Sequence, residues 1–496
     1  MKRRISYVQE VEIVQFVQIE RKADCAGDSS VIDKFAGAGT LMVENKFTLT
    51  RLKIILTAIF LSGYLLGAFV QAFSVNTDMD KADQRDYLVR AIHLKNDLYK
   101  NMTEGNRMPA YPYLLSFLYH PSMAMEEFFI RGKIFNIILS VLLLFFLYII
   151  FRSFLEGPEA KVLLLIIAFM VFMPRAGYVQ SELPFYFLTF CAFVLYWRCL
   201  ARPRFRLAAG AGLATACGYL TKASILPAVV WFVGSFFVIN IILPIVKGIS
   251  KKIRAAGTLS YKIILKNIGF LATFILIFLL TVSPYIRMNK KMFGRYFYNV
   301  NSNFYVWYDS WDEVVKGTRA HYDRLGWPKM LPEEIPGPIK YWHDHTIPQI
   351  IARLVHGFII VTTNAMGGIG YAQFFCIYFI ICILAIVQRY DEFIGYLTRN
   401  NHFPVAICLF LYFLLFYILD VFGAVIFKGP RHALAQYMPA LFAMFYFLSR
   451  FRFAIFLEKI KCHFTVREVH IVVFCLLVLD LIFYAPYRLY MVFNGW

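Results

Sequence analysis

The sequence predicts an all-α polytopic membrane protein, and its composition, its long apolar runs and the placement of its charges all support this fold class. Hydrophobic residues make up 59% of the 496 residues, whereas a soluble globular chain is about 45–50% apolar. Apolar runs of about 20 residues, the length that crosses a bilayer as a helix, recur along the chain. A helix satisfies its own backbone hydrogen bonds in lipid, so runs this long favour helices over a barrel.

The apolar runs predict about eleven transmembrane helices. In order, they cover residues 52–74, 132–151, 160–174, 183–200, 206–220, 224–246, 267–286, 366–387, 403–426, 433–449 and 468–488. Two longer polar stretches interrupt this pattern, and we name them the first polar segment (75–131) and the second polar segment (291–356). The remaining parts are a cytoplasmic tail of residues 1–50, a transmembrane module over 51–290 that contains the first polar segment, and C-terminal transmembrane helices over 357–496.

The net charge of +20 is explained by membrane topology. Nineteen Lys or Arg residues lie in five short connecting segments, at 152–161, 198–206, 247–266, 388–402 and 450–467. The short connections of opposite orientation hold only Arg175, Lys222, Lys428 and Arg431. By the positive-inside rule, the basic connections are cytoplasmic and both polar segments face the other side of the membrane. Anionic headgroups are the expected partners of the inner charges, and no nucleic-acid partner is needed.

The stretch DMDKADQRDYLVRA directly follows the first apolar run. We expect an amphipathic helix over 78–98 that lies on the membrane surface, with an apolar face formed by Tyr87, Ala91, Leu94 and Leu98. Asp83 is four residues before Tyr87 and shares a helix face with it. A carboxylate at the membrane face can act as a general base or bind a cation. The alternative, an N-cap or a solvated helix face, suits the other aspartates of the stretch better, namely Asp78, Asp80 and Asp86.

Arg107 lies in the same polar segment, within NRMPAYPYLLSFL at 106–118. A guanidinium at this position can bind a phosphate through two hydrogen bonds. The alternative is an arginine that extends its charge to the lipid headgroups. The two prolines of the stretch predict a bend that enters a second apolar helix.

The second polar segment is rich in Tyr, Trp and Asn, which suits contacts to sugar rings or, alternatively, an interfacial aromatic belt. Its His343-Asp344-His345 triplet has the HxH spacing of some metal sites. That spacing places two side chains on one face of a strand but not of a helix, and the sequence offers no third ligand. We therefore assign no metal residues.

The order of several short motifs resembles the GT-C superfamily of membrane glycosyltransferases. The closest branch contains protein O-mannosyltransferases, lipid A aminoarabinose transferases and the galacturonic acid transferases of lipopolysaccharide core. The resemblance begins with an Asp83-Gln84-x-x-Tyr87 element after the first span and an Arg107-x-Pro-x-Tyr111-Pro element after it. It continues through SELPFYFL (181–188), GLATACGYLTKAS (212–224) and SPYIRMNKKMFG (283–294). It covers residues 50–300 in order and the C-terminal third more loosely.

The resemblance implies a role for individual residues. Asp83 matches the catalytic aspartate, and Glu182 matches an acidic residue of the next outer connection, although an acid capping a helix N-terminus is an alternative. The basic residues that it assigns to the donor phosphate are Arg107, Arg287 and Arg431. Those that it assigns to substrate binding are Tyr87, Tyr111, Lys222 and His432. Two departures are Gln84, where the family often has Glu, and Tyr285, where it often has Trp; the first weakens the case for a metal held by paired acids.

The implied reaction is the transfer of a sugar from a polyprenyl-phosphate donor to a hydroxyl of a glycan, lipid or protein acceptor. It would take place at the non-cytoplasmic face of a bacterial inner membrane, with inversion and without an assigned cofactor, a divalent cation being the alternative. The rival interpretation is a transporter or flippase for a lipid-linked substrate. Asp420 and Asp480, in or near apolar runs, support that rival, but the sequence has no paired halves.

Overall fold

The computed structural model describes residues 51, 54–98, 100, 104–250, 257–366, 371–399, 402–429, 431–451, 454–457 and 462–485. The predicted tail of residues 1–50 lies outside them. The chain forms two units, Met1–Leu66 and Gly67–Trp496. Every candidate site residue lies in the second unit.

The predicted helical class is confirmed for the described residues. Their regular structure is helical except for one antiparallel pair, β1 (Ala454–Leu457) with β2 (Cys462–Thr465). Eight of their helices are long and apolar enough to cross a membrane. These are Ile54–Val75, Met125–Arg152, Gly157–Ala176, Glu182–Ala201, Ala223–Val246, Tyr261–Phe293, Ile347–Met366 and His402–Gly423. The chain is therefore a multi-pass membrane protein.

The count of eleven spans stays a prediction. Helices α9 (Phe205–Thr221), α20 (Arg431–Phe451) and α21 (Val466–Phe483) form where spans are expected, but they are shorter or more polar than those eight. Helix α17 (Ala372–Gln388) has the character of a span only together with α18 (Tyr390–Arg399), and the pair is bent by 91°.

One candidate span was not expected from the sequence. Helix α16 (Ile347–Met366) begins inside the stretch assigned to the second polar segment. Arg353 and His356 interrupt its apolar run, which explains why hydropathy alone placed the start of the next span at 366. Arg353 is nevertheless buried, so its charge does not face lipid.

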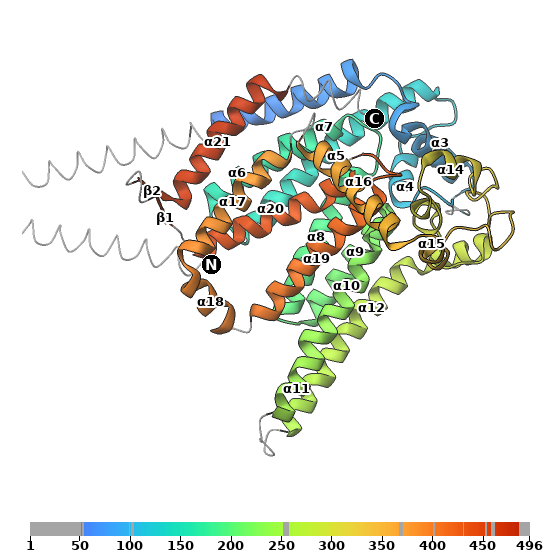
Figure 1. Ribbon diagram of the computed structural model, residues 1–496. Helices are drawn as coiled ribbons and strands as arrows, with labels where there is room; N and C mark the ends of the chain where they lie inside the picture. The colour runs from blue at the N-terminus through green and yellow to red at the C-terminus, as the bar shows by residue number, and fades with distance from the viewer. Residues whose placement is uncertain are drawn as a thin grey trace, which may run out of the picture. The chain divides into compact units, whose positions relative to one another are not determined.

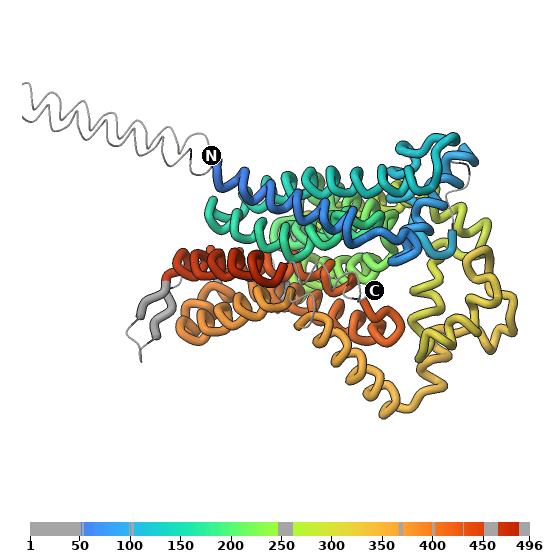
Figure 2. The backbone as a smooth tube through the Cα atoms, turned by 90° about the horizontal axis from the view of Figure 1, so that it is seen from above, coloured from blue at the N-terminus to red at the C-terminus, as the bar shows by residue number. Residues whose placement is uncertain are grey.

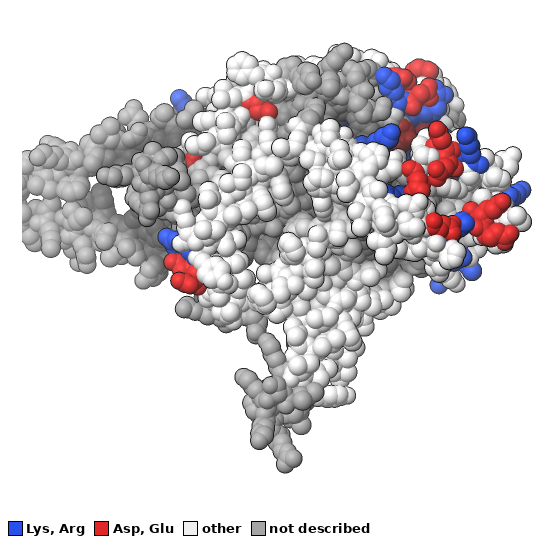
Figure 3. Space-filling view, viewed as in Figure 1, with Lys and Arg blue, Asp and Glu red and all other residues white. Residues whose placement is uncertain are grey.

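Within the second unit, α8 (Glu182–Ala201) packs against α9 and α20, and α9 packs along α12 (Gly257–Phe293) (Figure 1). Helix α16 packs against α19 (His402–Gly423). The visible flanks of these helices carry few charges, and Lys, Arg, Asp and Glu gather mainly at one end (Figure 3). Apolar flanks with a polar end suit helices that stand in lipid.

Both polar segments lie at this charged end of the second unit, as Figures 1 and 2 show. The first contains α3 (Gln84–Asn96) and α4 (Ala110–Ser116), and the second contains α13 (Val300–Asn303), α14 (Trp311–Lys316) and α15 (Pro338–Asp344). Gly105 joins them: its N–H donates to Arg324 O at 3.1 Å, and its own carbonyl accepts from Val300 N at 2.8 Å. A Cβ on Gly105 would lie 2.9 Å from Arg324 Cα, so only glycine permits this approach.

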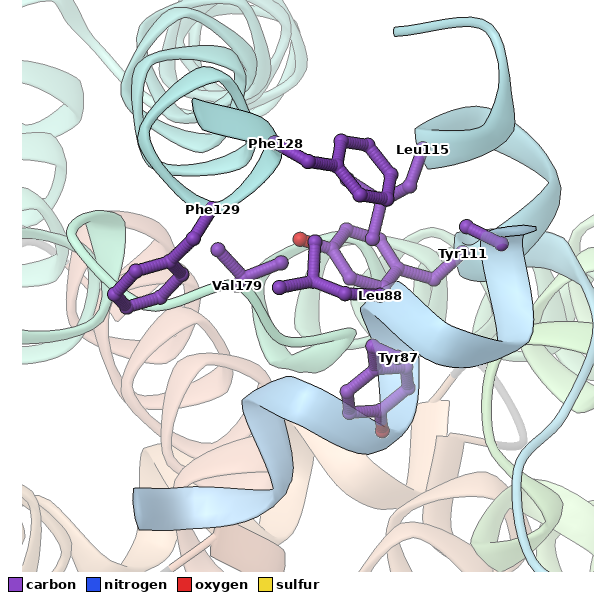
Figure 4. Packing of buried hydrophobic residues seen from close by; sticks show 8 residues of the cluster. Tyr87, Leu88, Tyr111, Leu115, Phe128, Phe129 and Val179 are labelled. Carbon is purple, nitrogen blue, oxygen red and sulfur yellow. The ribbon is translucent and has the colours of Figure 1, made fainter. Parts of the chain in front are cut away.

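The predicted apolar face of α3 is confirmed for Tyr87, Ala91 and Leu94, which are all buried. Leu98 is 72% exposed, because α3 ends at Asn96 and the chain turns away there. The buried face packs on protein: Figure 4 shows it against side chains of α4, α5 (Met125–Arg152) and the loop before α8. The cluster consists of Tyr87, Leu88, Ala91, Tyr111, Leu115, Phe128, Phe129 and Val179.

A buried arginine holds the second polar segment. Arg353 on α16 donates to three backbone carbonyls, those of Val306, Tyr308 and Phe422, at 2.8–3.1 Å. It also donates to Asp309 Oδ1 at 2.9 Å. His345 Nε2 lies 2.7 Å from the other oxygen of Asp309. We call Arg353, Asp309 and His345 the loop anchor.

Candidate functional site

Asp83 is the residue before α3, and its backbone is left-handed, with φ 67° and ψ 11°. Ala82 before it is also left-handed, at φ 58°. Non-glycine residues in this region cost about 1–3 kcal/mol each and persist only where the surroundings enforce them. The Asp83 side chain makes no capping hydrogen bond to its own helix, so its carboxylate is available to other partners.

Two arginines from distant parts of the chain bind the Asp83 carboxylate. Arg107 Nη2 lies 2.7 Å from Asp83 Oδ1 and 2.9 Å from Asp86 Oδ2. Arg431 Nη1 lies 3.0 Å from Asp83 Oδ2. Burial alone would raise the pKa of Asp83, but Arg107 and Arg431 outweigh it and lower this pKa to about 2. Asp83 is therefore ionised, and each of its oxygens has a cationic partner.

These contacts continue into a longer series of alternating charges. Arg431 Nη1 is 3.7 Å from Glu182 Oε1, which lies 3.2 Å from Lys222 Nζ. At the other end, Arg324 Nη1 is 3.7 Å from Asp86 Oδ2. We call the whole series the charge chain; in spatial order it consists of Lys222, Glu182, Arg431, Asp83, Arg107, Asp86 and Arg324. Its four cations exceed its three acids, so the group as a whole favours an anion.

Secondary structure places the charges at helix ends. Glu182 is the first residue of α8, where the positive end of the helix dipole favours an acid. Arg431 is the first residue of α20, where the same dipole disfavours a cation. Contact with Asp83 and Glu182 compensates for that position. Lys222 lies in the short break between α9 and Ala223–Ile225.

Glu182 is the most deeply buried acid of the charge chain, at 1% exposed. Its Oε1 contacts Lys222 and Arg431, whereas its buried Oε2 has no hydrogen-bond partner among the described residues. Buried polar atoms are nearly always paired, and an unpaired one needs an explanation such as water, an ion or a role in chemistry. Glu182 therefore fits a functional interior better than a helix cap.

The structure brings five of the sequence-predicted residues together: Asp83, Glu182, Arg107, Arg431 and Lys222 all belong to the charge chain. His432 follows Arg431 and is partly buried. Arg287 is different, since it is exposed on α12 and no ion pair of the described residues includes it. Its role toward a donor phosphate stays a prediction.

Tyr87 and Tyr111 were expected to contact a substrate, but both belong to the buried cluster of Figure 4. The Tyr87 hydroxyl lies 2.8 Å from Ser181 Oγ, and the Tyr111 hydroxyl donates to Asn136 Oδ1 at 2.8 Å. The rings meet edge to face, with centroids 5.3 Å apart. Their placement supports a packing role beneath Arg107, whose guanidinium lies 5.2 Å from the Tyr87 ring centre.

Sequence analysis missed two members of the charge chain. Asp86 was interpreted as part of a solvated face, although its spacing of three from Asp83 puts both on one side of a helix. Arg324 gave no local signal, because its place depends on the backbone junction at Gly105.

No group of three or more His, Cys, Asp or Glu residues in the described part of the chain is arranged to hold a metal ion. Of the HxH pair, His343 is exposed beside Asp344, and His345 belongs to the loop anchor. The acids of the charge chain are each paired with cations. The residues present therefore do not fit a divalent cation held by clustered carboxylates.

Comparisons with known proteins give no match: no protein-family model, curated protein or solved structure aligns significantly with this chain. The chemistry of the site is thus the basis for a functional assignment. An ionised acid between two guanidiniums, in a cluster with an excess of cations, can bind an anionic group and accept a proton next to it.

Proposed function

We propose that the protein is a glycosyltransferase that moves a sugar from a polyprenyl-phosphate donor to an acceptor hydroxyl at the non-cytoplasmic membrane face. The observation that supports this most is the Asp83 carboxylate between Arg107 and Arg431, at the polar end of a bundle of membrane helices. The order of motifs around these residues, which resembles the GT-C superfamily, is the second support. The acceptor is a glycan, a lipid or a protein.

In the proposed reaction, the acceptor oxygen attacks the anomeric carbon of the donor sugar. Asp83 takes the proton of that hydroxyl. A new carbon–oxygen bond forms as the bond from the anomeric carbon to the phosphate oxygen breaks, and the electron pair leaves with the lipid phosphate. Arg107 and Arg431 stabilise the charge on that leaving group. Attack opposite to the leaving group inverts the configuration.

The resting contacts impose an order on this reaction. With a pKa of about 2, Asp83 is a poor base while both arginines hold it. A donor phosphate competes for the same guanidiniums, because phosphate accepts bidentate hydrogen bonds from arginine. Binding of the donor would then draw Arg107 or Arg431 away and raise the basicity of Asp83. The base becomes active only when the donor is present.

The test is a transfer assay in nanodiscs with a panel of labelled polyprenyl-phosphate sugars and membrane extract as the source of acceptor. Wild type is compared with Asp83→Asn and with Asp80→Asn, whose carboxylate pairs with Arg85 on the exposed side of the same segment. We expect label transfer with wild type and Asp80→Asn and none with Asp83→Asn. Equal transfer by all three proteins would refute the assignment of the base.

One observation favours transport as a second candidate. Asp420, within the candidate span His402–Gly423, lines a cavity of about 10 Å³ together with Asn364 and Tyr371. That volume holds about one water molecule, and acids within spans often mark ion or proton paths. Flux of a lipid-linked substrate in proteoliposomes that stops with Asp420→Asn but continues with Asp83→Asn would favour a transporter.

A further inference from the structure

Two buried amides lie directly beside the strained turn that carries Asp83. Asn76 Nδ2 donates to Gln84 Oε1, and Gln84 Nε2 donates to Asn76 Oδ1, each at 2.8 Å. Both side chains are 0% exposed. We call this reciprocal pair the amide clamp. Asn76 directly follows the π-helical turn Gln71–Val75 that ends the first membrane helix, and Gln84 directly follows Asp83.

Both amides of the clamp also form hydrogen bonds with backbone groups. Gln84 Oε1 also accepts from Val179 N at 3.0 Å, and Gln84 Nε2 lies 3.2 Å from the carbonyl oxygens of Asp78 and Lys81. Asn76 Nδ2 donates in addition to Gly177 O at 2.8 Å. The clamp therefore joins the end of the first membrane helix, the turn before α3 and the loop before α8.

The residue on the other side of Asp83 is also held by an amide. Gln180 Nε2, from the loop before α8, donates to the carbonyl oxygen of Ala82. Ala82 and Asp83 are the two left-handed residues of the turn. Because these amides bind the backbone before Asp83 and anchor Gln84 directly after it, the turn cannot relax to an ordinary helix start without losing several hydrogen bonds.

We propose that Gln84 and Asn76 are positioning residues that hold Asp83 in its left-handed conformation, so that its carboxylate reaches Arg107 and Arg431 together. The effect on sugar transfer rests on the proposed function, whereas the effect on the backbone conformation of Asp83 does not. The clamp requires an amide at position 84, because that side chain must accept from Val179 N and donate to Asn76 Oδ1. A carboxylate there would face three acceptors with no proton to offer, which is costly in a buried place.

This requirement distinguishes the clamp from a paired-acid site. If position 84 served to bind a cation next to Asp83, glutamate would replace glutamine without loss or with gain of metal-dependent activity. If it serves as an amide, Gln84→Glu is damaging while ionised and is relieved on protonation. A protonated carboxyl donates one hydrogen bond to Asn76 Oδ1 and still accepts from Val179 N.

The experiment compares wild type, Gln84→Glu and the matched amide-to-acid control Gln349→Glu at pH 5.5 and pH 7.5. Gln349 uses its Oε1 atom to accept hydrogen bonds from Thr346 N and Thr346 Oγ1. A glutamate oxygen can accept both bonds equally well. We expect Gln84→Glu to lose about 30-fold in transfer rate at pH 7.5, with the donor KM changed less than about 3-fold, because the arginines remain. Its transfer rate, expressed relative to wild type at the same pH, should be at least about 5-fold higher at pH 5.5 than at pH 7.5. The control should match wild type at both.

Thermal unfolding of the same proteins separates this proposal from the proposed function. Burial and the surrounding acceptors raise the pKa expected for a glutamate at position 84. The folded Gln84→Glu protein therefore keeps its stability at low pH and loses stability as the pH rises through that pKa. The unfolding temperature of Gln84→Glu should therefore fall relative to wild type between pH 5.5 and 7.5, even if no donor in the panel is used. Asn76→Asp should show the same pH signature and replaces Gln84→Glu if that variant does not fold at pH 5.5.

Two results would overturn the clamp. One is a Gln84→Glu protein with wild-type transfer and stability at pH 7.5. The other is transfer by that variant that rises with added Mg²⁺ or Mn²⁺, which would identify position 84 as a cation ligand. Absence of transfer from wild type, together with the predicted pH-dependent unfolding, would refute the proposed function and retain the clamp.

Discussion

The charge chain and the loop anchor both contain an arginine bound to an aspartate, but they differ in what surrounds the pair. In the loop anchor, Arg353 has three backbone carbonyls as partners besides Asp309, and its side chain is 4% exposed. In the charge chain, Arg107 binds the carboxylates of Asp83 and Asp86, and Arg431 binds those of Asp83 and Glu182. Backbone carbonyls cannot be exchanged without moving the chain, whereas a carboxylate can be replaced by another anion.

The two clusters show how a contact that holds the fold together differs from a contact of similar length that can bind a ligand. The loop anchor involves ordinary backbone and links two parts of the fold. The charge chain includes Asp83, which like the neighbouring Ala82 has a costly backbone conformation, and a buried oxygen of Glu182 with no hydrogen-bond partner among the described residues. Strain and unmet hydrogen bonding are tolerated where function requires them. Four substitutions or conditions test this contrast.

The largest expected effect is on transfer when Asp83 is changed. Asp83→Asn should lower the transfer rate by about 10²–10⁴-fold, the usual contribution of a general base. Asparagine tolerates the left-handed conformation, so the protein should still fold, with an unfolding temperature lowered by the loss of the ion pairs to Arg107 and Arg431. The matched change Asp309→Asn should also lower the unfolding temperature but should leave transfer within about 3-fold of wild type. Identical effects of both changes on rate and stability would remove the distinction between the two clusters.

The next effect is on stability when Arg353 is changed. Arg353→Gln removes the arginine donors from three partly buried backbone carbonyls and from Asp309 Oδ1. We expect a loss of about 3 kcal/mol or more in the free energy of unfolding. Denaturant unfolding in detergent measures it. Arg389→Gln, at an exposed pair with Glu392, is the control and should cost at most about 0.5 kcal/mol. A loss for Arg353→Gln no larger than for the control would show that the anchor does not hold the fold.

A smaller effect is expected on donor binding. Arg107 is 11% exposed and contacts both Asp83 and Asp86, whereas Arg324 is 30% exposed and its ion pair with Asp86 is longer, at 3.7 Å. Arg107→Gln should weaken donor binding by about 10–100-fold, the worth of a charge-assisted hydrogen bond. Arg324→Gln should weaken it by less than about 3-fold. Titration of a fluorescent polyprenyl-phosphate analogue gives both values, and the reverse order would move the phosphate toward Arg324.

The smallest effect is on the pH dependence of the loop anchor. Burial alone would lower the pKa of His345, but its hydrogen bonds with Asp309 and the Tyr341 carbonyl raise it above the ordinary value of 6.5. The charged pair is therefore complete below pH 6.5 and is lost as the pH rises through the folded-state pKa. Proteolysis of the second polar segment should be about 2–5-fold faster at pH 8.5 than at pH 6, since Arg353 still holds Asp309.

His345→Gln should remove this pH dependence, and His343→Gln should retain it because that ring is 87% exposed. A pH dependence that survives in His345→Gln would assign it to another group.

Hydropathy was sufficient to predict the helical class and the position of most membrane helices, because each depends on a local apolar run. It missed α16, whose apolar run is broken by an arginine that the fold buries. Asp83, Arg107 and Arg431 were indicated by motif order, yet their contacts depend on tertiary structure. The left-handed backbone at Ala82 and Asp83 has little sequence signal, since Ala disfavours this region and Asp adopts it only occasionally. It is imposed by amides from positions 76, 84 and 180.

The contact of Arg431 with Asp83 joins residues that are 348 positions apart. At roughly 5–20 residues per second, a ribosome needs about 20–70 s to make the intervening chain. During that time Asp83 lacks the contact with Arg431, while the intervening helices are inserted into the membrane. The site is thus completed only after all residues up to Arg431 have been made. A nascent chain released before Arg431 would carry inserted helices but an incomplete centre, so chemistry is coupled to the delivery of all the intervening helices into the bilayer.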